Sequence, residues 1–233
     1  MNPILVALDV ESSARAIALA DMLRGSVGGF KIGKQLFTAA GPSMVRELSS
    51  RGDRVFLDLK FHDIPNTVAG AVQAAVATGA WMVNVHASGG SAMMAAAAAA
   101  ARTAAETLGL PRPLVVAVTV LTSMDNEGLA EIGVARPMLD QVVHLATLAR
   151  ASGLDGVVAS PHEVRAIRSA CGSDFQIVTP GIRPAGQQGK DDQARTLTPA
   201  QAIAAGSSYL VIGRPITGAP NPREAAEQIA ASL

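Results

Sequence analysis

The chain has 233 residues, a length that suits one α/β barrel of roughly 200–250 residues as well as two small domains. Its content of 49% hydrophobic and 16% charged residues excludes an intrinsically disordered chain and predicts a folded domain. Lys plus Arg and Asp plus Glu both number 19, so no net charge draws the chain to nucleic acid or to an anionic membrane, and any anion site must be local.

Short β-branched runs and helix-like stretches alternate along the chain. The runs that predict strands are residues 4–8, 29–32, 55–59, 81–85, 114–118, 156–158, 176–179 and 209–212. The stretches that predict helices are residues 12–24, 42–50, 67–78, 91–108, 137–152, 161–170, 199–205 and 222–232. Strict alternation of this kind is typical of parallel β-α units.

Eight β-α units without a Pro-rich linker or a charge block favour a (β/α)8 TIM barrel over an open doubly wound sheet. We therefore expect residues 1–233 to form a single domain. In such a barrel, the side chains that perform chemistry lie at the C-terminal ends of the strands. The candidates at these predicted ends are Asp9, Lys31, Asp58, Lys60, His86, Thr122, Pro180, Arg183, Gly213 and Arg214.

The third predicted strand carries two charged residues at its end. Asp58 and Lys60 are two apart and project to the same side of a strand, which places a carboxylate beside an ammonium at the barrel mouth. Asp63 follows three residues later, and a lysine between two carboxylates stays protonated. The pattern predicts that Lys60 acts as an acid. The alternative for an isolated Asp-x-Lys pair is a buried ion pair that only stabilises the strand end.

A second signal indicates a phosphate site. Gly181 and Arg183 follow the seventh predicted strand, and Gly213 and Arg214 follow the eighth. The loops after these two strands commonly bind phosphate in this fold, because glycine lets backbone N–H groups approach and arginine adds a planar charged fork. Either pair alone would fit a plain turn, but both at matched strand ends favour an anion site.

The chain also carries signals of cellular compartment. Its start lacks a basic leader, and no apolar stretch approaches the ~20 residues needed to span a bilayer. Cys171 is the only cysteine, which excludes an internal disulfide. We expect a cytoplasmic protein.

Six segments, read together, carry a resemblance: residues 8–9, 30–34, 56–67, 120–124, 179–184 and 211–215. They closely resemble the bacterial orotidine 5'-phosphate decarboxylases, nearly from end to end. The Asp-x-Lys-x-x-Asp core at Asp58, Lys60 and Asp63 is shared by a wider suprafamily, and the extension at residues 64–67 makes the match specific.

The resemblance implies a homodimer of (β/α)8 barrels with shared active sites. It implies decarboxylation of orotidine 5'-monophosphate to UMP and carbon dioxide in de novo pyrimidine synthesis, without a metal or organic cofactor. Lys60 would protonate C6 of the pyrimidine, and Asp58 would hold Lys60. Asp63 and Thr67 would reach into the neighbouring subunit's site.

The same resemblance implies a set of substrate contacts. Asp9 and Lys31 would bind ribose hydroxyls, and Lys31 would also join the charges around Lys60. Thr122 would touch the pyrimidine edge. The implied phosphate ligands are Arg214, the Gly213 backbone and Gln193, with Arg183 in the same region, and Ile64 and Pro180 complete the substrate-binding set.

Two other functions are alternatives to the decarboxylation of orotidine 5'-monophosphate. A metal-dependent phosphosugar lyase of the same suprafamily, such as a keto-gulonate phosphate decarboxylase, shares the Asp-x-Lys-x-x-Asp core. Those relatives carry an acidic metal ligand at the end of the second strand, where this chain has Lys31, whose charge would repel magnesium. The other function is a barrel that binds nucleotide without catalysis, which the presence of Asp58, Lys60 and Asp63 disfavours.

Overall fold

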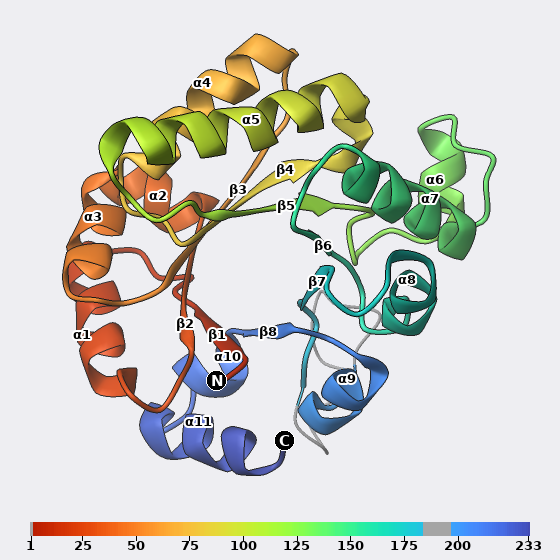
Figure 1. Ribbon diagram of the computed structural model, residues 1–233. Helices are drawn as coiled ribbons and strands as arrows, with labels where there is room; N and C mark the ends of the chain where they lie inside the picture. Colours follow the sequence, from red (N-terminus) through yellow and green to blue (C-terminus); the bar gives the residue numbers. More distant parts are fainter. Residues whose placement is uncertain (1, 184–196) are drawn as a thin grey trace.

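The computed structural model describes residues 2–183 and 197–233, and it shows a closed barrel of eight parallel strands (Figure 1). Each strand pairs with the next one along the chain, and β8 pairs with β1. The strands are β1 (Ile4–Ala7), β2 (Gly29–Gly33), β3 (Val55–Phe61), β4 (Met82–His86), β5 (Leu114–Val118), β6 (Gly156–Val158), β7 (Gln176–Thr179) and β8 (Tyr209–Ile212). All eight predicted strands are confirmed, and β3 runs two residues further than predicted.

Helices surround the barrel on its outside. They are α1 (Ser13–Leu23), α2 (Lys34–Ala40), α3 (Ser43–Ser50), α4 (Pro65–Val76), α5 (Gly90–Leu108), α6 (Asn126–Glu131), α7 (Met138–Ala151), α8 (Val164–Cys171), α9 (Pro199–Ala205), α10 (Arg214–Thr217) and α11 (Pro222–Ala231), with a 3-10 turn, η1, at Ala87–Gly89. The predicted helix start at residue 67 is wrong by two residues, because Pro65 suits the first turn of α4. The predicted start at residue 161 is wrong by three, because Glu163 accepts the Ser160 N–H in a turn and α8 begins only after it.

The strands divide the apolar side chains into two clusters. Inside the barrel lie Leu5, Ala7, Phe56, Met82, Val116, Val178 and Val211. Alternate residues, such as Val55 and Leu57 of β3, face outward and pack against the helices. Because Phe56 faces inward, Asp58 two residues later points toward the barrel mouth, as the spacing predicts.

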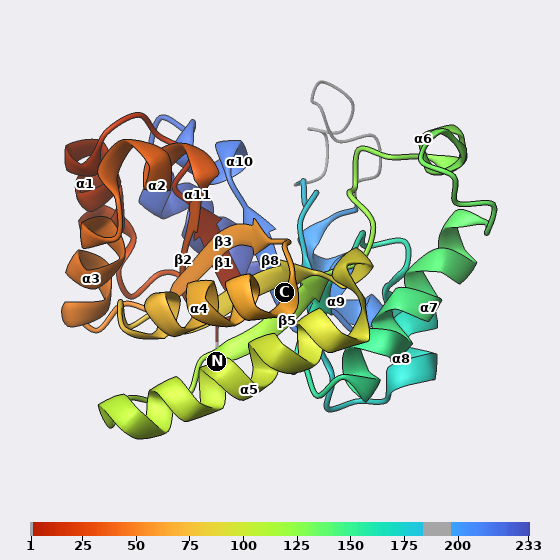
Figure 2. The same cartoon turned by 90° about the horizontal axis from the view of Figure 1, so that it is seen from above.

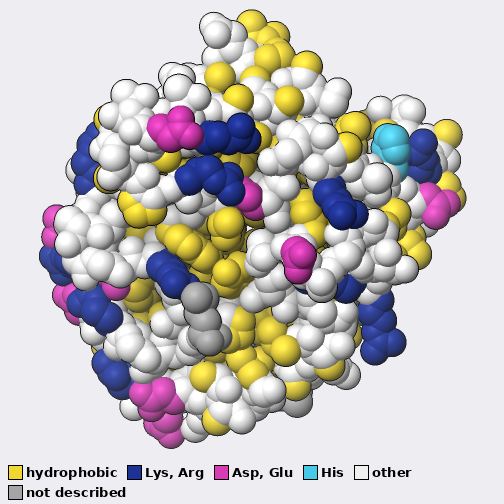
Figure 3. Space-filling model, viewed as in Figure 1, with side chains coloured by type: hydrophobic (Ala, Val, Ile, Leu, Met, Phe, Trp, Pro, Cys, Tyr) yellow, Lys and Arg dark blue, Asp and Glu magenta, His cyan; other side chains and the backbone are white. Residues whose placement is uncertain are grey.

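The two ends of the barrel differ. In the side view, α6 and α10 lie beyond one end, where β5 and β8 finish, and the N-terminus lies at the other (Figure 2). The end shown in Figure 3 has hydrophobic side chains at its centre and interspersed acidic and basic side chains around its rim. This mixture of charges matches the equal numbers of acidic and basic residues in the sequence.

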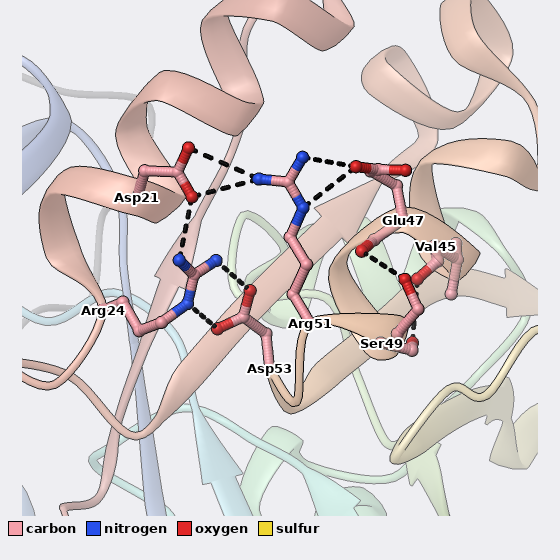
Figure 4. A network of polar contacts seen from close by, with 8 residues as sticks. Asp21, Arg24, Val45, Glu47, Ser49, Arg51 and Asp53 are labelled. Carbon is pink, nitrogen blue, oxygen red and sulfur yellow. Dashed lines mark hydrogen bonds and ion pairs between the residues drawn. The ribbon is translucent and has the colours of Figure 1, made fainter.

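An ion-pair network ties the helices to the start of β3 (Figure 4). Arg24 donates from Nε and Nη2 to the two carboxylate oxygens of Asp53, at 2.9 and 2.7 Å. Asp21 accepts from both Arg24 and Arg51, and Arg51 also pairs with Glu47. Exposed pairs contribute up to about 1 kcal/mol each, and the Asp53 side chain, only 6% exposed, is the most protected member. The network stabilises the end of the barrel where the strands begin.

A search for membrane-spanning helices among residues 2–183 and 197–233 finds none long and apolar enough.

Candidate active site

A cavity of about 440 Å³ opens at the C-terminal ends of the strands. Its wall contains nine of the thirteen residues that the sequence predicts for the site: Asp9, Lys31, Asp58, Lys60, Thr122, Pro180, Arg183, Gly213 and Arg214. It also contains Gly181, from the predicted phosphate loop after β7, and eight residues that were not predicted: Ala7, Phe56, Val118, Val120, Leu121, Val158, Val211 and Thr217. The cavity therefore joins the ends of, or the loops after, β1, β2, β3, β5, β6, β7 and β8.

Four charged side chains form an array along one side of the cavity, from β1, β2 and β3. The Lys31 ammonium lies 3.0 Å from Oδ1 of Asp9 and 3.5 Å from Oδ2 of Asp58. The Lys60 ammonium lies 2.5 Å from Oδ1 of Asp58. Positive and negative groups alternate, so each buried charge has a partner of opposite sign.

Gly33 leaves the space that the Lys31 ammonium occupies. A Cβ atom at this position would lie 2.8 Å from Nζ of Lys31 and 3.2 Å from Oδ1 of Asp9. Since Lys31 is itself only 8% exposed, its ammonium has little room to move away. Because Gly33 has no side chain, the Lys31 ammonium can lie between Asp9 and Asp58.

The carboxylate of Asp58 is the centre of the array. Burial alone would raise its pKa, but the charges of Lys31 and Lys60 and hydrogen bonds from Lys60 and Asn84 outweigh burial, so the pKa lies below the usual value. Asp58 therefore stays ionised at neutral pH. An ionised Asp58 keeps an ammonium fixed at the point where β3 ends.

The end of β3 is irregular, and this irregularity directs Lys60. Leu57 pairs with Val83 and Phe61 pairs with Val85, so three residues of β3 between the two pairs lie opposite a single residue, Asn84, of β4. Lys60 has φ 56°, the only positive φ of a non-glycine residue in the described ranges. Its backbone N–H donates to the side-chain Oδ1 of Asn84 at 2.8 Å. The bulge thereby turns Lys60 into the cavity.

The floor of the cavity is apolar. Ala7, Phe56, Val118, Val158 and Val211 line it from five strands, below the charged array. An apolar wall lowers the local dielectric, which strengthens each electrostatic interaction in the cavity. The alternation of residues in each strand could have indicated these side chains.

Two arginines from neighbouring loops also line the cavity. Arg183 follows β7, is 8% exposed, and donates from Nη1 to the carbonyl of Ile182 at 2.9 Å. Arg214 begins α10 directly after Gly213. Thr217 at the end of α10 adds a hydroxyl to the same wall. The pairing of β7 with β8 explains why two loops distant in sequence meet at one place.

The other predicted residues do not line this cavity. Asp63, Ile64 and Thr67 are exposed on the loop and first turn before and within α4, and Ile64 is 67% exposed. Asp63 accepts the backbone N–H of Ile64 at 2.7 Å. Gln193 lies outside the described residues.

Asn84 is the functional-site residue that sequence reasoning missed most clearly. It is fully buried on β4, and its Nδ2 donates to Oδ1 of Asp58 at 2.7 Å. The one signal in the sequence is a polar residue in the apolar run at 82–85, two residues before His86 and hence on the same face.

In the described part of the chain, no three His, Cys, Asp or Glu side chains gather as a metal site. Asp9 and Asp58 do approach one position from two sides, but the Lys31 ammonium occupies it.

Comparison with known proteins gives one consistent family. Residues 2–229 match the model of the family described as orotidine 5'-phosphate decarboxylase / HUMPS. An orotidine 5'-phosphate decarboxylase of Moorella thermoacetica is 58% identical over 100% of this chain and 92% of its own length. One from Paramagnetospirillum magneticum is 55% identical over 100% and 99%. The crystal structure of orotidine 5'-phosphate decarboxylase from Lactobacillus acidophilus superposes with a TM-score of 0.88 at 39% identity, covering 100% of this chain and 99% of that one.

Proposed function

The chain belongs to the orotidine 5'-phosphate decarboxylase / HUMPS family, and from that premise we propose that Lys60 is the proton donor of its reaction. The chain is a decarboxylase that converts orotidine 5'-monophosphate to UMP and carbon dioxide, a step of pyrimidine biosynthesis. The observation that most supports the role of Lys60 is its ammonium in the cavity, held 2.5 Å from Asp58.

The chemistry explains why an ammonium is needed at this place. When the bond between C6 and the carboxyl carbon breaks, carbon dioxide leaves and the electron pair stays on C6, in the ring plane, where no π system accepts it. Enzymes supply roughly 8–23 kcal/mol of transition-state stabilisation, and a fixed charge beside the developing carbanion is an effective source. Lys60 stabilises the electron pair, transfers a proton to C6, and regains a proton from water.

The two sides of the cavity bind different parts of the substrate in this proposal. Arg183, Arg214 and the Gly213 backbone bind the phosphate dianion, since arginine forks match phosphate oxygens. Asp9 and Lys31 bind the ribose hydroxyls. Thr122 and Pro180 contact the base, and Gln193, outside the described residues, completes the phosphate contacts.

Lys31 also supports a reaction without a metal ion. A divalent cation between Asp9 and Asp58 would have to displace the Lys31 ammonium, which already neutralises both carboxylates. The phosphosugar lyases of the suprafamily need an acidic ligand at this position. We therefore propose that neither a metal nor an organic cofactor takes part.

The exposed loop after β3 is assigned to a second subunit. Asp63, Ile64 and Thr67 are exposed and lie outside the cavity wall of their own chain. Their exposure leaves these side chains accessible to a second chain, and the family resemblance has Asp63 and Thr67 reach into the neighbouring subunit's site. The proposal is a cytoplasmic homodimer with shared active sites.

Replacing Lys60 tests its role directly. Lys60→Ala should lower turnover of orotidine 5'-monophosphate by more than about 1000-fold, because both the acid and the charge at C6 are lost, while UMP still binds. The absorbance change of the substrate measures turnover, and calorimetry measures UMP binding. Lys34→Ala is the matched control, since Lys34 is exposed at the start of α2 and outside the cavity wall. Near-normal turnover by Lys60→Ala would refute the assignment.

A further inference from the structure

The buried amide of Asn84 contacts both halves of the pair formed by Asp58 and Lys60. We propose that Asn84 is a positioning residue for decarboxylation, whose single side chain fixes the backbone of Lys60 and the carboxylate of Asp58 at the same time. The inference rests on the proposed role of Lys60 as the proton donor.

The backbone of Lys60 has a left-handed conformation, with φ 56°. A left-handed conformation costs a residue with a side chain roughly 1–2 kcal/mol, so surrounding contacts must hold it. At the bulge between Leu57 and Phe61, β3 loses its regular ladder with β4. The side-chain Oδ1 of Asn84 accepts the Lys60 N–H at 2.8 Å and so replaces the missing ladder acceptor. This bond favours the conformation that aims the Lys60 side chain into the cavity.

Asn84 also holds the carboxylate of Asp58. Its Oδ1 accepts from Nδ2 of Asn84 at 2.7 Å and from the Lys60 ammonium at 2.5 Å. Two donors on one oxygen fix the rotation of the carboxylate. The remaining oxygen, Oδ2, faces Lys31 at 3.5 Å. Asn84 thereby keeps Oδ1 of Asp58 toward the Lys60 ammonium and Oδ2 toward the Lys31 ammonium.

An amide is the side chain that can perform both tasks. A backbone N–H needs an acceptor and a carboxylate needs a donor, and the amide of Asn or Gln offers both on one carbon, in one rigid plane. The two contacts also determine the orientation of the amide, because the reversed orientation would set N–H against N–H and oxygen against oxygen. Asn84 is fully buried, so water does not readily replace a lost contact.

Asn84 lies behind this pair and is not part of the cavity wall. Its loss should therefore lower kcat more than it weakens binding. In Asn84→Ala, a Lys60 ammonium displaced by about 1 Å should lower kcat by about 100-fold, with the Kd for UMP changed by less than about fivefold.

Met82→Ala is the matched control for the loss of packing. Met82 is also fully buried on β4, points into the barrel two residues earlier, and packs in the cluster with Phe56. Its truncation should lower the free energy of unfolding by about 2–5 kcal/mol and kcat by less than about tenfold. If Asn84→Ala loses no more kcat than Met82→Ala, Asn84 is only a core residue and the inference is wrong.

A second variant separates positioning from folding through its pH profile. Asn84→Asp keeps an acceptor for the Lys60 N–H but sets a second carboxylate beside Asp58, and two such groups raise the pKa of one of them. The charged groups around this position are Asp58 and Lys60 from β3, with Lys31 of β2 on the far oxygen of Asp58. On β4 itself His86 follows two residues later, and burial lowers its pKa to about 4, so it stays neutral in this pH range, whereas β5 presents the apolar Val116. When the new carboxyl is protonated, its O–H again donates to Asp58.

The kcat deficit of Asn84→Asp relative to the unmodified chain should therefore shrink by at least about tenfold between pH 8 and pH 5. A deficit that stays constant over this range would overturn the inference. The outcome is distinguishable from a failure of the proposed function. If Lys60→Ala were active, the role of Lys60 would fail. If Lys60→Ala is inactive but Asn84→Ala matches Met82→Ala, only the role of Asn84 fails.

Discussion

Two ionisable residues beside Lys60 keep one protonation state at neutral pH. Asp58 stays ionised because the neighbouring ammonium groups outweigh its burial. His86, half-buried at the end of β4, stays neutral, because burial and then the neighbouring His62, Lys60 and Lys34 lower its pKa to about 4. Asp58 and His86 therefore each keep one charge state between about pH 5 and 8.

The shift of His86 makes stability depend on pH. Between its folded pKa of about 4 and its ordinary value of 6.5, the unfolded chain binds a proton that the folded chain does not. The free energy of unfolding therefore rises with pH through this window, by about 1–2 kcal/mol after allowance for partial exposure. His86→Asn should remove this rise in urea unfolding, whereas His144→Asn, on the exposed face of α7, should keep it. An unchanged slope in His86→Asn would contradict the account.

The sequence predicts those contacts of the site that join residues close together in the chain. Asp58 and Lys60 could be predicted, because a spacing of two on a strand is enough to place them side by side. Asn84 could not, because its bonds to Lys60 and Asp58 span 24 and 26 residues of sequence and depend on a bulge. The fixed separation of Lys31 from Asp58 likewise follows from the register of β2 on β3.

At the scale of elements, strand order was easier to predict than strand detail. Apolar runs bounded by glycine or polar residues indicated all eight strands, and proline near the first turn indicated several helix starts. The short helices α2, α6 and α10 were missed because none of them is long enough to show a clear helical period. Asp125, whose side chain caps α6 by accepting the Gly128 N–H at 2.9 Å, was the available signal.

Close approach of neighbouring strands makes one glycine of β6 essential. A Cβ on Gly156 would lie 2.1 Å from the backbone carbonyl oxygen of Gln176 on β7, a contact that only movement of a strand can relieve. Gly156→Ala should lower the free energy of unfolding by about 3 kcal/mol or more. Gly128→Ala on α6, where the new Cβ meets Asp125 at an ordinary 3.6 Å, should raise it by about 0.5–1 kcal/mol. Equal urea midpoints for the two variants would refute the close packing of β6 on β7.

At the scale of the whole molecule, the proposed homodimer would make the cavity and the exposed loop of one barrel halves of two different sites. Lys60 lies inside the cavity of its own chain, whereas Asp63 lies outside it and exposed. In the proposed homodimer, each site takes Lys60 from one subunit and Asp63 from the other. Mutations at the two positions should then complement each other in mixed dimers.

Complementation is measured by mixing inactive Lys60→Ala and Asp63→Ala proteins. Random exchange yields about half mixed dimers, each with one intact site, so about one quarter of the normal activity should return. Each variant mixed with itself is the control. Activity that does not return, despite subunit exchange confirmed by mass spectrometry, would show that the sites are not shared.

We propose that this barrel decarboxylates orotidine 5'-monophosphate with its own charged side chains and without a metal ion. The rate of carbon dioxide release from this substrate, before and after dialysis against EDTA, tests this directly. We expect the same rate in both, because Lys31 and Lys60 supply the positive charge that a metal ion would supply in a related lyase. A rate that EDTA abolishes and magnesium restores would contradict it.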